Sequence, residues 1–197
     1  PMKNGEDIDN AQCAMLVGRN PYAADPTQWR ALKALKKRGG RIVVIDPIQG
    51  PASRIADVYL RPRPGTDAAL ALSIAHLLVK WGSYDSEFVE RWCHGFEQYK
   101  ERIDKFSPEV AARLTGVSIS DIVAAAKAYS AGPSVCVPGH GIDAFSAGVQ
   151  TFRAFDCLVA ISGNLDRLGG NRLTKKPTGF RTYLDLIHDP QFRLPVE

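Results

Sequence analysis

The sequence lacks several features that would place it in a functional class at once. No apolar run approaches the roughly 18 residues that a membrane-spanning helix needs, and no signal peptide is visible. The lysines and arginines behind the formal net charge of +4 are scattered, without the interleaved aromatic residues typical of nucleic-acid binding. These absences argue against membrane insertion by this segment and against a nucleic-acid partner.

Cysteine is also scarce. The four cysteines, Cys13, Cys93, Cys136 and Cys157, show no Cys-x-x-Cys spacing, so neither a zinc knuckle nor a redox pair is predicted. Three of them, Cys13, Cys136 and Cys157, stand in apolar runs, where we expect buried small hydrophobic side chains. No Ser/His/Asp or Cys/His arrangement is apparent either. The sequence therefore assigns neither a catalytic residue nor a metal ligand.

A third absence concerns glycine. The G-x-G-x-x-G fingerprint of Rossmann dehydrogenases is missing, because Gly18 is followed by Arg19, Asn20 and Pro21. This disfavours a small Rossmann-type dehydrogenase.

What the sequence does contain is a regular alternation of strands and helices. The 197 residues, 45% of them hydrophobic, are typical of one globular domain. Strands are expected at 11–17, 42–45, 58–60 and 134–137, and helices at 27–38, 68–80, 86–92, 96–103, 108–114, 118–129 and 148–161. This order predicts an α/β fold with a parallel sheet and helices on both faces, a three-layer sandwich related to dinucleotide-binding folds. We assign 1–165 to this domain and 166–197, which is polar and rich in Gly and Pro, to a linker or arm.

Three predicted strands end in similar residues. Gly18-Arg19-Asn20, Asp46-Pro47 and Gly139-His140-Gly141 each follow an apolar run. Ligands of open parallel sheets bind at the carboxyl ends of the strands, where glycine lets a ligand approach the backbone and a carboxylate can bind ribose hydroxyls. The alternative is that these residues only make turns, as Gly and Asp commonly do after strands.

The order of short motifs decides between these alternatives. The motifs are Asn4-Gly5-Glu6-Asp7-Ile8-Asp9-Asn10-Ala11, Met15-Leu16-Val17-Gly18-Arg19-Asn20-Pro21, Arg38-Gly39-Gly40, Val44-Ile45-Asp46-Pro47, Arg61-Pro62-Arg63-Pro64-Gly65-Thr66-Asp67-Ala68-Ala69-Leu70, Thr115-Gly116-Val117 and Ser162-Gly163-Asn164-Leu165. Together they resemble the molybdopterin oxidoreductase superfamily, which includes dimethyl sulfoxide reductase, formate dehydrogenase and nitrate reductase. The resemblance covers about residues 4–170.

The resemblance implies a role in cofactor binding. It places this chain as the third of four domains, holding the guanosine end of one molybdopterin guanine dinucleotide that carries molybdenum or tungsten. Asn20 would face the diphosphate or ribose, and Asp46 would bind ribose hydroxyls beside the rigid Pro47. Gly65 and Asp67 would meet the guanine edge. The implied cofactor-binding residues are Gly18, Asn20, Asp46, Pro47, Gly65, Asp67, Gly139, His140 and Gly141, the last three toward the pterin. Alternatively, Asp67 only stabilises the start of the following helix.

The sequence also departs from the family pattern. Ile48 stands where arginine typically follows the Asp-Pro motif, which removes one expected phosphate contact. The iron–sulfur segment and the metal ligand are expected in a missing amino-terminal part, so this fragment alone is expected to be inactive. Its expected partners are the remaining domains of a cytoplasmic or periplasmic prokaryotic enzyme and electron-transfer subunits. A stand-alone nucleotide-binding or scaffold module is the alternative.

Overall fold

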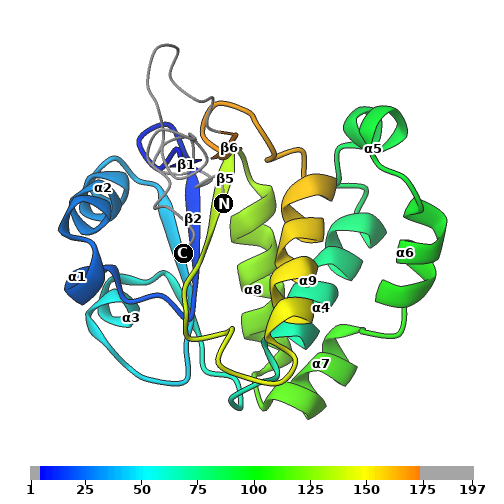
Figure 1. Ribbon diagram of the computed structural model, residues 1–197, viewed down its shortest axis with the longest axis horizontal. Coiled ribbons are helices and arrows are strands. Elements are labelled where there is room, and N and C mark those ends of the chain that lie inside the picture. Colours follow the sequence, from blue (N-terminus) through cyan, green and yellow to red (C-terminus); the bar gives the residue numbers. More distant parts are fainter. Residues whose placement is uncertain (1–4, 174–197) are drawn as a thin grey trace, which may run out of the picture.

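The core of the molecule is a four-stranded parallel sheet (Figure 1). In the computed structural model, which describes residues 5–173, its strands are β2 (Cys13–Val17), β3 (Arg41–Ile45), β4 (Val58–Leu60) and β5 (Ser134–Pro138). Their order in the sheet is β4-β3-β2-β5, and every neighbouring pair is parallel. The predicted parallel α/β sheet is therefore confirmed.

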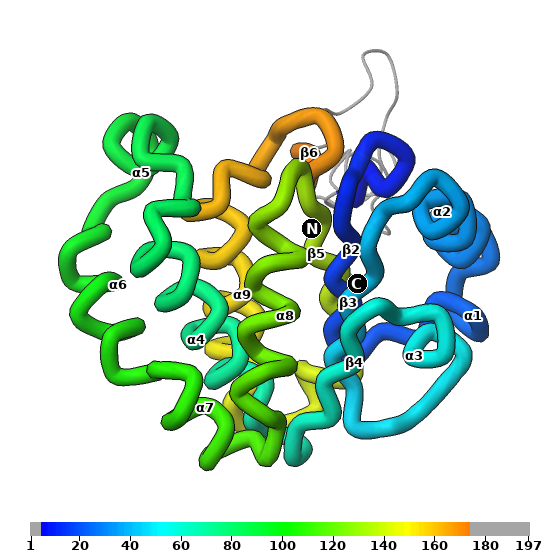
Figure 2. Tube along the Cα trace, turned by 180° about the vertical axis from the view of Figure 1, so that it is seen from behind, coloured from blue at the N-terminus to red at the C-terminus, as the bar shows by residue number. Residues whose placement is uncertain are grey.

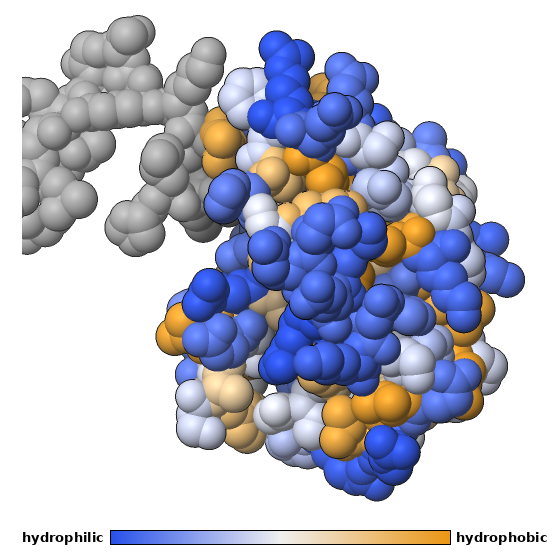
Figure 3. Space-filling model, turned by 90° about the vertical axis from the view of Figure 1, so that its right-hand side faces the viewer, coloured by the Kyte–Doolittle hydropathy of each residue, from blue (hydrophilic) through white to orange (hydrophobic). Residues whose placement is uncertain are grey.

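Helices cover both faces of this sheet, as Figures 1 and 2 show from opposite sides. One face carries α1 (Pro21–Ala24), α2 (Pro26–Lys37) and α3 (Pro51–Ile55), and the other carries α4 (Asp67–Lys80), α8 (Ile119–Ser130) and α9 (Gly148–Ile161). A further layer of α5 (Ser86–Trp92), α6 (Phe96–Ile103) and α7 (Pro108–Thr115) packs outside the second group. Figure 3 shows this outer side as mostly hydrophilic, with separate apolar patches.

The alternation of side chains along the strands explains the two helical layers. In β2, Met15 and Val17 belong to the core under α4, α8 and α9, whereas Ala14 and Leu16 belong to the core under α2. Since all five residues of β2 are buried, this strand reads as a continuous apolar run, as expected for the centre of a parallel sheet. Asp25 is the N-cap residue of helix α2. Its carboxylate accepts the Gln28 N–H and so satisfies a free amide of the first turn.

A second, smaller sheet was not predicted. Strand β1 (Gly5–Glu6) pairs antiparallel with β6 (Asn171–Arg172), beside the amino end of the large sheet. The predicted division at residue 165 stays a prediction, but Asn171, which follows it, is only 6% exposed and contacts β5 directly.

Two asparagines close the outer edge of β5. The Asn171 side chain accepts the Cys136 N–H at 2.9 Å and donates to the Cys136 carbonyl at 2.7 Å. The Asn164 side chain accepts the Ser134 N–H at 3.0 Å. After Ser134 and Cys136, the next residue of β5 whose backbone faces away from β2 is Pro138, and a proline has no N–H that needs a partner. Side-chain amides thus take the place of a fifth strand.

One expectation about the cysteines was wrong. Cys13 and Cys136 are buried as predicted, and burial raises the pKa of the Cys13 thiol to about 12. Cys157 is exposed, because it lies on the side of α9 that neighbouring helices leave uncovered. Across residues 5–173, three or more His, Cys, Asp or Glu side chains nowhere gather in an arrangement that could hold a metal ion. No helix in this range is long and apolar enough to cross a membrane.

Candidate functional site

The ends of the four strands meet at one edge of the sheet. Val17 is in register with Ile45 and with Pro138, and Ile45 with Leu60. Gly18, Asp46 and Gly139 therefore begin neighbouring loops, as the sequence predicted. Strand β2 lies between β3, which follows it in the chain, and β5, which comes much later. The loops after β2 and β5 thus flank the point where the strand order reverses, the usual ligand position in such sheets.

Three glycines allow these two loops to touch through their backbones. The Gly139 N–H donates to the Val17 carbonyl at 2.8 Å, and the Gly141 N–H donates to the Gly18 carbonyl at 3.2 Å. A Cβ atom on Gly139 would lie 2.8 Å from Arg19 Cα, closer than real contacts allow. Gly18 itself has a φ of +54°, which favours glycine. Close packing of the two loops therefore explains why glycine occupies positions 18, 139 and 141.

A cavity of about 150 Å³ opens beside the β2 and β3 ends. Its walls include Asn20 and Asp46, two of the predicted binding residues, together with Ile48, Gly50 and Ser53. Asp46 Oδ1 accepts the Ile48 N–H at 2.8 Å, which fixes the carboxylate at the mouth of the turn. Burial raises the pKa of Asp46, and this hydrogen bond partly opposes the shift. The arrangement offers a half-buried carboxylate and an exposed amide to one ligand.

Asp67 is the most buried carboxylate at this edge. The residue is 5% exposed and is the first residue of α4, after Thr66 at the N-cap position. Burial raises its pKa, its own backbone N–H lowers it, and the nearby Asp46 charge raises it. Among residues 5–173, no other group donates a hydrogen bond to this carboxylate. Burial and the start of α4 therefore act on the pKa of this carboxyl in opposite directions, and burial has the larger effect.

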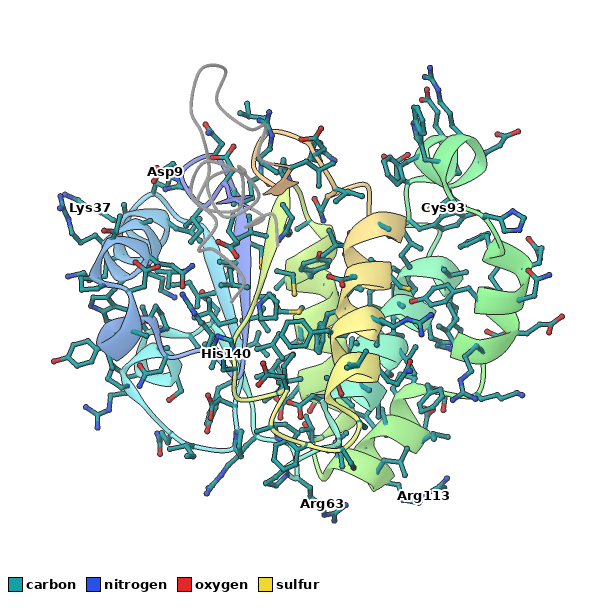
Figure 4. The ribbon with its side chains drawn as sticks, in the orientation of Figure 1. Asp9, Lys37, Arg63, Cys93, Arg113 and His140 are labelled. Carbon is teal, nitrogen blue, oxygen red and sulfur yellow. The ribbon has the colours of Figure 1, made fainter. Side chains whose placement is uncertain are left out.

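The turn before Asp67 is anchored to α7. The Arg63 guanidinium donates to the carbonyls of Arg113 and Leu114 at 2.9 and 3.1 Å, as Figure 4 places Arg63 beside Arg113. The Arg63 carbonyl in turn accepts the Thr66 hydroxyl at 2.6 Å. Gly65, with a φ of +80°, lies against the ring of Phe145 in the loop after β5. These contacts bring the predicted Gly65 and Asp67 toward the same edge as Asp46.

The remaining predicted residues are less enclosed. Pro47 is half-buried, and its carbonyl accepts Arg61 Nε at 2.9 Å. The His140 side chain is 94% exposed, and its Nδ1 pairs with Asp143 at 2.9 Å (Figure 4). His140 does not line the 150 Å³ cavity. Its hydrogen-bond partner among the described residues, Asp143, belongs to the same loop.

One residue that the predicted site omits is Arg19. It lines the cavity that contains Asn20 and Asp46, and also a larger one of about 360 Å³ that runs along the outer side of β5. Its Nε donates to Gln28 Oε1 at 3.0 Å. The sequence feature that could have indicated Arg19 is the presence of a positively charged residue between Gly18 and Asn20, in the loop that follows a strand.

The raised pKa of Asp67 leads to a prediction about stability. The unfolded chain ionises this carboxyl near its ordinary value of 3.8, whereas the folded chain keeps the proton to a higher pH. At a pH between the unfolded and the folded pKa, the folded state binds more protons than the unfolded state. The contribution of Asp67 to the free energy of unfolding therefore falls as the pH rises through this range, and it is constant above the folded pKa. We expect Asp67→Asn to gain stability relative to the wild type as the pH rises above the ordinary carboxyl value of 3.8, and this gain to level off above the folded pKa. Urea unfolding at several pH values measures this difference, and a pH-independent difference would contradict the expectation.

The model of the molybdopterin oxidoreductase family matches residues 3–180, most of the chain. The chain belongs to this family. Membership confirms the resemblance on which the site residues were chosen, and it implies a metal-carrying molybdopterin cofactor.

Relatives of this molybdopterin oxidoreductase chain are named for different activities. It is 36% identical to the F420-dependent formate dehydrogenase 1 subunit alpha of Methanococcus maripaludis, with 83% of this chain and 24% of the relative aligned. It is 32% identical to formate dehydrogenase H of Escherichia coli, over 82% and 23%. The structure of acetylene hydratase from Pelobacter acetylenicus aligns with a TM-score of 0.77 at 30% identity, over 82% of this chain and 23% of that one. The chain thus spans about a quarter of the length of these relatives.

The residues present fit part of such a cofactor. The small cavity combines a carboxylate, an amide and a hydroxyl, from Asp46, Asn20 and Ser53, which suit ribose hydroxyls and phosphate oxygens. The buried Asp67 carboxylate suits a ligand that brings paired N–H donors. Within residues 5–173, no group of three or more His, Cys, Asp or Glu side chains could hold a metal ion.

Proposed function

We propose that this domain holds the guanosine end of a molybdopterin guanine dinucleotide within a larger molybdenum or tungsten enzyme. The cofactor would supply the redox or hydration chemistry when bound, and this domain would bind and orient it. The observation that carries the proposal is that Asn20, Asp46 and Asp67 follow the neighbouring strands β2, β3 and β4 at one edge of the sheet, where the Asp46 charge raises the pKa of Asp67. Asp46 alone, or Asp67 alone, would not distinguish a ligand site from an ordinary turn or helix start.

The proposed division of labour follows from the chemistry of each group. Asp46, half-buried at the end of β3, would accept ribose hydroxyls. Asn20 would donate to a phosphate or ribose oxygen from the other side of the same cavity. Asp67 would accept both the guanine N1–H and the 2-amino group, a pair of donors that adenine does not have. Gly139, His140 and Gly141 would lie toward the pterin.

Guanine selectivity provides the test. We expect the 197-residue chain to bind GDP more tightly than ADP in calorimetry, because adenine would leave the buried Asp67 carboxylate without donors. That penalty is on the order of 1–3 kcal/mol, or about tenfold to a hundredfold in affinity. Asp67→Asn is expected to lose most of this preference, because its amide nitrogen opposes a guanine donor.

A matched control is Asp9→Asn, which removes one exposed carboxylate at the opposite end of the molecule (Figure 4). This variant is expected to keep the wild-type preference. Measurable binding of GDP and ADP with equal affinity by the wild type would exclude the proposed recognition of guanine.

A further inference from the structure

Arg19 stands out as a cation that two cavities share. It follows Gly18 at the end of β2 and lines both the 150 Å³ cavity and the 360 Å³ cavity. Among the residues that line either cavity in the described part of the chain, Arg19 alone carries a positive charge. Its side chain is 22% exposed, so it is neither free in solvent nor sealed in the core.

The guanidinium has donors to spare. Nε donates to Gln28 Oε1 at 3.0 Å, and Nη2 lies 3.5 Å from Asp25 Oδ2. Asp25 is already engaged through its other oxygen, which accepts the Gln28 N–H at 3.0 Å and begins α2. A guanidinium offers five N–H donors in a planar fork, and only one of those on Arg19 makes a close hydrogen bond. Both partners, Asp25 and Gln28, line the 360 Å³ cavity, and the remaining donors of the guanidinium make no close hydrogen bond within the described residues.

The opposite wall of the smaller cavity has no cation to offer. Ile48 follows the Asp46-Pro47 turn there, and its side chain is 74% exposed. Asp46 contributes a carboxylate, which would repel a phosphate group in the same space unless a cation were near. Arg19 reaches this cavity from the neighbouring strand and meets that requirement.

We propose that Arg19 binds the diphosphate of the nucleotide in the cavity it shares with Asn20 and Asp46, as the cation that the position of Ile48 does not provide. The inference rests on the proposed function and adds to it the residue that recognises the diphosphate. Arginine suits this task because its fork can donate two parallel hydrogen bonds to phosphate oxygens. The weak pairing with Asp25 would be given up when the anion binds, whereas the Gln28 contact can persist.

The experiment compares GDP with guanosine, since only GDP carries the diphosphate. Calorimetry on the full 197-residue chain is expected to show that Arg19→Gln weakens GDP binding by about tenfold or more, the usual range for a charge-assisted hydrogen bond. Guanosine binding should change by less than about twofold, because the lost contact is to phosphate alone. Arg30→Gln makes the same charge change at an exposed position on α2 that lines neither cavity, and it should leave GDP affinity unchanged.

A second variant guards against indirect effects of losing Arg19. Ile48→Arg places a cation on the opposite wall at an exposed position, so folding is not at risk. Added to Arg19→Gln, it is expected to restore most of the GDP affinity without altering guanosine binding. Unchanged GDP affinity in Arg19→Gln, or an equal loss for GDP and guanosine, overturns the role of Arg19 while guanine selectivity stands. Absence of GDP binding by the wild-type chain, or equal affinity for GDP and ADP, overturns the proposed function and this inference with it.

Discussion

Asn171→Ala is expected to lower the free energy of unfolding by about 2–6 kcal/mol, because two buried backbone groups each lose a partner at a cost of about 1–3 kcal/mol. These groups are the N–H and the carbonyl of Cys136, which the Asn171 amide contacts at 2.9 and 2.7 Å. Cys136 is 1% exposed and Asn171 6%, so solvent does not readily replace the amide. Urea unfolding followed by circular dichroism measures the loss.

Asn10→Ala is the matched control for this prediction. Asn10 is exposed, and its amide contacts only the Asp7 carboxylate, at 2.9 and 3.1 Å. Its removal is expected to change stability by no more than about 0.5 kcal/mol. Similar losses in the two variants would show that the edge of β5 does not depend on Asn171.

Gly139→Ala is expected to destabilise the domain by about 2–4 kcal/mol, above the usual range for overpacking because the obstacle is backbone. The added Cβ would lie 2.8 Å from Arg19 Cα and 2.9 Å from the Gly18 carbonyl carbon. Neither atom can rotate away, so the loops after β2 and β5 must separate. GDP binding should weaken together with stability, because the same loops position Arg19 and Asn20.

Gly50→Ala provides the contrast, because a Cβ on Gly50 would meet nothing within 4 Å and its φ of −123° suits any residue. Its stability is expected to equal or exceed that of the wild type by up to about 1 kcal/mol. Chemical denaturation of both variants under the same conditions decides the matter. A Gly139→Ala protein as stable as Gly50→Ala would mean that the two loops can part without cost.

The sequence predicted the long elements well because their periodicity is local. The strand predicted at 58–60 matches β4 and the helix predicted at about 148–161 matches α9, whereas α4 begins at Asp67, one residue before its predicted start. Helices α1 and α3 were missed, since each spans only four or five residues and begins at a proline in what reads as a turn. Their formation depends on packing against the sheet more than on their own pattern.

Some features of the candidate site could likewise be predicted from the sequence, and others could not. The positions of Gly18 and Asp46 after strands could be predicted, because apolar runs ending in such residues are a local signal. That Gly139 packs on Gly18, and that Asn171 closes the edge of β5, could not, because each contact joins residues far apart in the chain. Arg19 was not predicted for a related reason: its proposed role depends on the absence of a cation at Ile48, which lies in the loop after a different strand, β3.

The order of the strands has a consequence for how the domain assembles. Strands β2, β3 and β4 are consecutive in the chain and adjacent in space, so their pairing closes short loops. Strand β5 joins β2 only after the long helical region between β4 and β5 has been gathered in, and the entropy of closing a loop grows with its length. The contact between the loops after β2 and β5 is therefore the least local part of this edge. On a ribosome, the packing of the β5 loop against Gly18 would form last, after β2, β3 and β4 have been made.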